Sequence, residues 1–243
     1  MESNQCQNCG NTFSGRYCNH CGQKLNSGRI QFNHVIGDVV ATVFSLESPI
    51  VRTIRGLTIH PGKLAKAYIA GKRKSYNRPA QYFLVMIALH FIVLKLLNID
   101  YLDLQQRAFG TSIQNQNSNA VFSFIVKNLN YFSFIMAIWL SLFSKLFFLK
   151  TRYSLIELFS FFLFVLGQGF LFHTLFLVIA DQWIIWYHVA HTFQLLYILF
   201  AIYTFFEAKW WIRFPLSLFA LVFGSLLYFF SVGFLASVIL FRL

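Results

Sequence analysis

The chain has 243 residues, of which 57% are hydrophobic and 19% aromatic, with only 12% charged and a mean hydropathy of +0.59. A soluble domain of this length cannot bury so much apolar surface, so the composition excludes an ordinary globular protein and favours an integral membrane protein. Lys and Arg outnumber Asp and Glu by 20 to 8. The polar N-terminus lacks the apolar stretch and small-residue cleavage site of a signal peptide, so we expect no cleaved leader.

All four cysteines fall within the first 21 residues, as two Cys-x-x-Cys-Gly units formed by Cys6 and Cys9, then by Cys18 and Cys21. Two thiolates at this spacing can bind one side of a tetrahedral ion, so together the units predict a closed structural Zn²⁺ site. An iron centre or a reactive dithiol pair are the alternatives. His20 is expected to be solvated rather than a ligand. We therefore expect residues 1–28 to form a small cytoplasmic zinc ribbon that folds around its metal.

Residues 29–79 are expected to form short amphipathic juxtamembrane helices. Apolar residues recur at helical spacing over residues 35–48, but this segment is too short to span a bilayer. The Ser-Pro pair that follows is typical of a helix cap and first turn, which predicts a second helix over residues 49–59. A third helix should cover residues 61–70 and end at Gly71, because glycine is favoured just beyond a helix C-terminus.

The segment from Arg52 to Arg78 carries eight of the twenty Lys and Arg residues and no acid. Basic clusters beside a spanning helix are attracted to anionic headgroups, by about 1 kcal/mol for each residue, and they also orient the protein. Nucleic acid is a less favoured ligand, and a protein partner or an acidic ligand is the other alternative. The candidate headgroup or partner-binding residues are Lys63, Lys66, Lys72, Arg73, Lys74 and Arg78.

Residues 6–85 resemble an uncharacterised bacterial family of multi-pass membrane proteins with an N-terminal zinc ribbon. The resemblance is carried by the two cysteine units and by a juxtamembrane signature that joins Pro-Gly, Gly-Lys-Arg and Pro. Around the second cysteine unit the matching residues are Gly15, Tyr17, Gly22 and Gln23. In the juxtamembrane signature they are Pro61, Gly62, Tyr68, Gly71, Lys72, Arg73, Tyr76, Pro79 and Tyr82. The resemblance implies a ribbon joined to several membrane helices in the bacterial inner membrane, and it implies no particular reaction.

The expected fold is an all-α integral membrane protein, with a five-helix transmembrane bundle over residues 80–243. Five apolar runs are long enough to span, namely 80–99, 131–149, 155–180, 184–206 and 214–241, and a polar outer loop is expected over 100–130. If all five runs span, sixteen Lys and Arg residues lie on the same side of the membrane as the N-terminus and three lie on the opposite side. This bias predicts a cytoplasmic N-terminus and an outer C-terminus.

Polar side chains inside spanning helices are costly unless they are paired or face a cavity. His173 and His191 lie at equal distances from the turn at Asp181, about 10 Å below the outer end at 1.5 Å per residue. His188 lies about one turn nearer the surface. The sequence therefore predicts an intramembrane polar cluster of His173, His188, His191 and Asp181 that could bind a metal, relay protons or line a pore. The simpler interpretation is that these histidines hydrogen-bond between helices.

The sequence contains no phosphate-binding glycine loop, HExxH motif, nucleophile elbow or paired-carboxylate motif. We therefore expect a non-enzymatic protein whose zinc ribbon and basic segment recognise or regulate a partner at the cytoplasmic face of the membrane. One alternative is an oligomeric channel, pore or transporter, such as a membrane effector of a defence or stress system. Another is a membrane-embedded metal-dependent enzyme that uses the outer histidines. The expected partners are anionic lipid headgroups and either another protein or further copies of this chain.

Overall fold

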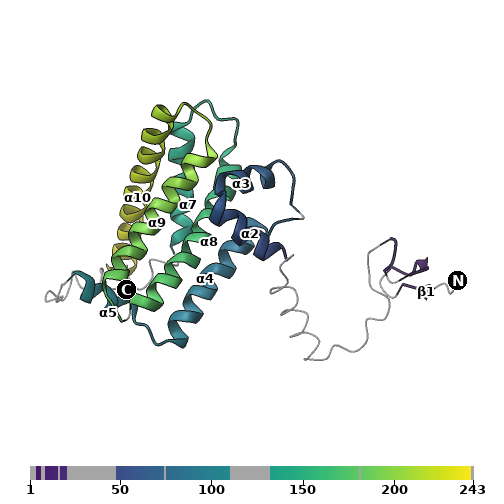
Figure 1. Cartoon of the computed structure of the whole chain (residues 1–243), viewed down its shortest axis with the longest axis horizontal. Coiled ribbons are helices and arrows are strands. Elements are labelled where there is room, and N and C mark those ends of the chain that lie inside the picture. The colour runs from purple at the N-terminus through teal and green to yellow at the C-terminus, as the bar shows by residue number, and fades with distance from the viewer. Residues whose placement is uncertain are drawn as a thin grey trace. The chain divides into compact units, whose positions relative to one another are not determined.

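The computed structural model describes residues 4–6, 9–15, 17–20, 48–73, 75–109, 132–180 and 182–241 (Figure 1). The chain divides into two compact units, Met1–Ser48 and Pro49–Leu243. The helix expected over residues 35–48 lies outside the described residues except for Ser48. Cys21, Lys74 and Asp181 also lie outside them.

The first unit contains a small antiparallel pair of strands. Strand β1 (Asn4–Gln5) pairs with β2 (Thr12–Phe13), so that Asn4 lies opposite Phe13. The buried side chains of Phe13, Cys6 and Cys18 form a small apolar cluster. A core of this size is too small to fold by burial alone, so the unit depends on a further source of stability.

Helices make up most of the second unit. They are α2 (Pro49–Ile59), α3 (Pro61–Ile69), α4 (Pro79–Leu96), α5 (Tyr101–Phe109), α7 (Ser133–Phe147), α8 (Leu155–Ala180), α9 (Ile185–Phe205) and α10 (Trp210–Phe241). Helix α3 is followed by Gly71 at a φ of 108°, a backbone conformation that side chains other than glycine rarely adopt. Helix α10 begins four residues before the expected span over 214–241.

Four of these helices, α4, α8, α9 and α10, are long and apolar enough to cross a membrane. The chain is therefore a membrane protein, as its composition predicts. Helix α7 is apolar but only 15 residues long. At 1.5 Å per residue it measures about 22 Å, less than the roughly 30 Å thickness of a bilayer core. Among the described residues, the second of the five expected spans thus corresponds to a helix too short to cross unaided.

Helix α8 lies at the centre of the bundle. Every residue from 161 to 170 is buried, as in helices that are apolar on all sides. Helices α4, α7 and α9 pack against α8, and so do the two short helices α2 and α3 (Figure 1). The first turn of α8 is fixed by a capping box, in which Ser154 N–H donates to Glu157 Oε2 at 2.7 Å and Glu157 N–H donates to Ser154 Oγ at 3.3 Å.

Helices α2 and α3 form a hairpin that packs against α8 and α9. The apolar side chains that α2 and α3 bury are Leu57, Leu64 and Ala65. Gly62 lies so close to the backbone of Thr204 and Phe205 that a Cβ at this position would collide with it. The basic segment predicted to anchor the protein at the membrane surface is thus also part of the helical core.

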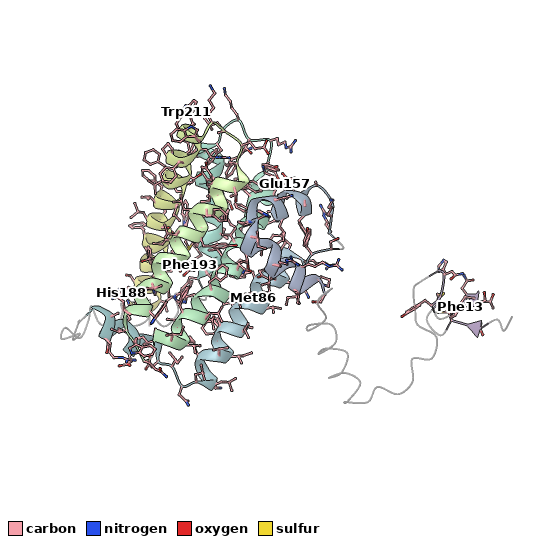
Figure 2. All side chains as sticks on the ribbon, in the orientation of Figure 1. Phe13, Met86, Glu157, His188, Phe193 and Trp211 are labelled. Carbon is pink, nitrogen blue, oxygen red and sulfur yellow. The ribbon has the colours of Figure 1, made fainter. Side chains whose placement is uncertain are left out.

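We define the basic end of the bundle as α2 and α3 with the α7–α8 connection (148–154) and the α9–α10 connection (206–209). Figure 2 places Glu157 and Trp211 toward this end and His188 toward the opposite one. At the opposite end, the expected outer loop over residues 100–130 begins with helix α5. Leu104 of α5 is fully buried and packs in a cluster with Leu177 of α8 and Tyr187 of α9.

Gly62→Ala is expected to lower the free energy of unfolding by about 1 to 3 kcal/mol, as overpacking of a close contact does. Alanine ordinarily stabilises a helix by up to about 1 kcal/mol over glycine, but here the added methyl meets rigid backbone. Thermal unfolding of the detergent-purified chain measures the change.

Gly233→Ala is the matched control, because no heavy atom lies within 4 Å of a Cβ at Gly233 in α10. Its unfolding temperature should be unchanged or slightly raised. Equal stability of the Gly62→Ala and wild-type chains would show that α3 does not pack tightly on α9.

Candidate functional site

Three of the predicted metal ligands lie together in the first unit. The Sγ atoms of Cys6, Cys9 and Cys18 all lie within 4.8 Å of one another, and those of Cys9 and Cys18 are 3.6 Å apart. Four thiolates bound tetrahedrally at about 2.3 Å from a metal lie about 3.8 Å from each other, so the observed spacing fits such an ion. These three thiols could therefore bind a metal, whereas the predicted fourth ligand, Cys21, lies outside the described residues.

A tight turn explains why the first two thiols meet. Gly10 N–H donates to the carbonyl of Cys6 at 2.9 Å, and Cys6 N–H donates to the carbonyl of Asn11 at 2.9 Å. Gly10 has a φ of 72°, which glycine adopts without steric cost. The Cys-x-x-Cys-Gly spacing thus encodes the turn directly, and β1 and β2 extend from it.

One of the six candidate basic residues is used inside the bundle. Lys66 Nζ lies 2.5 Å from Oε1 of Glu207, which joins α3 to the α9–α10 connection. The hydrogen bond and charge of Lys66 hold the pKa of the Glu207 carboxyl below its usual range. Because the Glu207 side chain is 82% exposed, this pair is screened by water and fixes position more than it adds stability.

The other described basic candidates, Lys63, Lys72, Arg73 and Arg78, are exposed. The guanidinium of Arg73 lies 5.9 Å from the centre of the Tyr68 ring, and that ring packs edge-on against Phe164 of α8. The structure therefore separates Lys66, which pairs within the bundle, from a set of exposed cations that can meet an external anion.

Buried and partly buried hydrogen bonds join the basic segment to the spanning helices. Tyr82 of α4 donates its hydroxyl proton to Oε1 of Gln168, and Gln168 Nε2 donates to Thr58 Oγ1 of α2 at 3.0 Å. Tyr197 of α9 donates to the carbonyl of Leu57 at 3.0 Å. We call the side chains of Tyr82, Gln168, Thr58 and Tyr197 the polar seam. Because Gln168 is fully buried, its amide must find partners, and these hold α2 and α4 against α8.

Of the predicted polar cluster, His173 and His191 lie next to each other in the structure. His173 also lies next to His90, which the prediction did not include in the cluster. The ring centres of His173 and His191 lie 4.8 Å apart, and those of His173 and His90 lie 5.6 Å apart. The three rings form a chain from α4 through α8 to α9. His90 Nδ1 lies 2.8 Å from Thr174 Oγ1, and His191 Nδ1 lies 2.9 Å from the carbonyl of Tyr187.

In the sequence, His90 could be recognised only as a polar residue inside a spanning helix. The tight turn between α8 and α9 sets the relative depth of the histidines on those two helices, but it gives no depth for a residue on α4. The ring of His188 lies 5.8 Å from that of Tyr187, and Asp181 is outside the described residues. Glu207 was also missed, although it is an acid in a connection whose other charged residue is the basic Lys209.

Residues 47–91 match the family described as a protein of unknown function (DUF3667). The match covers α2, α3 and the first part of α4, which is the part that carries the predicted juxtamembrane signature. Together with the three clustered thiols and the apolar helices, it fits an uncharacterised family of membrane proteins. No curated protein and no solved structure matches the chain.

Cys18→Ser is expected to reduce bound metal from about one ion per chain to nearly none, because it removes one of the three clustered thiolates that could bind the ion. Elemental analysis of the purified protein measures the metal. His20→Ala serves as the control, since His20 is exposed and lies two residues from Cys18. If the Cys18→Ser protein kept its full metal content, the cysteine cluster could not be the metal site.

Proposed function

We propose that this is a non-enzymatic protein of the bacterial inner membrane, whose cytoplasmic zinc ribbon and basic segment recognise an acidic partner at the membrane face. The observation that carries the proposal is the packing of α2 and α3 into the bundle. A partner that binds an exposed basic surface packed on spanning helices can alter the arrangement of those helices. A loosely attached anchor could not transmit such a change.

Zn²⁺ is the metal proposed for the ribbon, with Cys21 as the fourth ligand. Zn²⁺ favours four thiolates in a tetrahedral arrangement, and the 3.6 Å spacing of Cys9 and Cys18 is consistent with its bond length. A site with four protein ligands has no position for a substrate. The metal therefore stabilises a binding module rather than supplying chemistry.

Charge distribution supports the proposed orientation. The basic end carries the exposed Lys and Arg residues of α2 and α3, and Lys150, Arg152 and Lys209 lie in its connections. Loops rich in Lys and Arg are retained on the cytoplasmic side of membranes. Exposed Trp210 and Trp211 at the start of α10 are typical of the interface between lipid and water.

The partner is proposed to be acidic because the recognition surface is basic throughout. Lys63, Lys72, Arg73 and Arg78 are exposed, and neither α2 nor α3 contains an acid. Complementary charge increases the rate at which partners meet and selects against basic competitors. The ribbon would then supply a second contact, so that two weak interactions together give one stable complex.

Arg73→Glu is expected to abolish cross-linking to the partner in living cells, because it replaces an attraction with a repulsion at an exposed site. A photo-reactive residue placed at Lys72 captures the partner, and mass spectrometry identifies it. Cys18→Ser should weaken the same cross-link by unfolding the ribbon.

Lys209→Glu is the matched control, since Lys209 is an exposed cation at the same end of the bundle but outside the basic segment 52–78. Its cross-links should equal those of the wild type. The proposal fails if the wild-type, Arg73→Glu and Cys18→Ser chains capture the same proteins in the same amounts.

The contact of His90, His173 and His191 favours a second candidate, an ion or proton pathway through the bundle. Three adjoining imidazoles on three different helices can pass a proton from ring to ring, and such groups inside membrane helices often mark ion pathways. The pathway would have to continue beyond these rings, and further copies of the chain could supply its walls.

His173→Ala tests the second candidate, because His173 is the central ring of the three. If the histidines conduct, proton flux into liposomes that contain the purified chain should fall to the level of protein-free liposomes. His60→Ala, an exposed change outside the chain of rings, should conduct as the wild type does. Flux that survives His173→Ala assigns the histidines a structural role.

A further inference from the structure

A cavity of about 620 Å³ opens at the basic end of the bundle. It lies between the α7–α8 connection, the α9–α10 connection and the first turns of α10, with Lys66 of α3 at its edge. Its volume falls within the range of about 300 to 1,000 Å³ that small-molecule sites occupy. Neither the metal site nor the histidine chain contributes to it.

One part of the cavity is apolar and rigid. Phe148 and Phe206 stack with their ring centres 3.9 Å apart and their planes 4° from parallel, and both rings are almost completely buried. Ile212 and Leu216 of α10 complete this wall. Side chains this tightly packed do not collapse into the space, so the cavity presents a preformed surface for an acyl chain.

The other part is cationic. Lys150 and Arg152 line the cavity and are exposed, and neither forms an ion pair among the described residues. Lys66 also lines it but is paired with Glu207. Three cations and one carboxylate thus give the rim a net positive charge, and Arg152 can bind a phosphate through two parallel hydrogen bonds.

The depth of the cavity relative to the membrane surface indicates where its occupant comes from. Ile212 lies in the same helical turns as Trp210 and Trp211, which are exposed at the start of the spanning helix α10. Tryptophan favours the boundary between headgroups and acyl chains. A ligand with a phosphate in water and an apolar chain in the membrane would therefore reach both parts of the cavity at once.

We propose that this cavity binds an anionic phospholipid, with its phosphate on Lys150 and Arg152 and an acyl chain against Phe206, Ile212 and Leu216. The headgroup then lies beside the ion pair of Lys66 and Glu207, which joins α3 to the α9–α10 connection. The site is distinct from the exposed cations Lys63, Lys72, Arg73 and Arg78 and does not depend on the proposed partner recognition.

The test uses the full-length chain in nanodiscs of phosphatidylcholine and phosphatidylglycerol, released into mild detergent for native mass spectrometry. The wild type should retain phosphatidylglycerol in preference to phosphatidylcholine. A Lys150→Ala and Arg152→Ala double variant should bind phosphatidylglycerol about 25-fold more weakly, at about fivefold for each basic residue removed.

A Lys72→Ala and Arg73→Ala double variant is the control, because it removes the same charge from the exposed residues after α3, outside the cavity. Its affinity for phosphatidylglycerol should equal that of the wild type. Ile212→Trp fills the apolar part while it leaves every charge in place, so it should also displace the lipid.

Three results would overturn the proposal. The first is undiminished retention of phosphatidylglycerol by the Lys150→Ala and Arg152→Ala chain, and the second is an equal loss in the control variant. The third is displacement of the lipid by inorganic phosphate alone, because it would show that the cavity selects a soluble anion without an acyl chain.

Discussion

The burial of α8 along residues 161–170 is the constraint on which the rest of the second unit depends. A helix covered on every side needs neighbours around its whole circumference, and α4, α7 and α9 provide part of this cover along residues 161–170. Helices α2 and α3 complete the cover there, through the T-shaped contact of Tyr68 with Phe164 and the buried side chain of Leu57. The basic segment is therefore fixed by the same burial that holds the spanning helices together.

Gln168 fixes the position of α2 along α8. Apolar contacts alone would allow α2 to slide along α8, whereas a buried amide is satisfied only where Tyr82 and Thr58 both reach it. Gly62 limits the hairpin in the same way, since α3 can approach α9 so closely only where no side chain intervenes. Pro61, Gly62, Tyr68 and Tyr82 all belong to the juxtamembrane signature read from the sequence, and each has a packing role in the structure.

Local signals in the sequence were sufficient for the ends of the short helices α2 and α3, and long-range packing was not accessible from them. Pro49, Pro61 and Gly71 mark ends because each acts on its own backbone, and the apolar runs locate α4, α8, α9 and α10. The short length of α7 could not be read, because the apolar residues around it continue beyond the helix. His90 illustrates the limit for the site: its neighbours on α8 and α9 depend on how far α4 is shifted along them, which no spacing within one helix reports.

The two charged features of the basic end have different roles, and Lys66 shows why. In sequence it is one cation among eight, yet its bond to Glu207 places it between the exposed basic surface of α3 and the cavity beside Phe148 and Phe206. An anion in the proposed lipid site would compete with Glu207 for Lys66, and the proposed acidic partner would act on the same bond. Because the Glu207 side chain is exposed and the pair is weak, either event would shift it without unfolding the hairpin, which Gly62 and Gln168 hold in place. Under both proposals, residues 61–69 would be the segment through which a signal passes between the membrane interior and its surface.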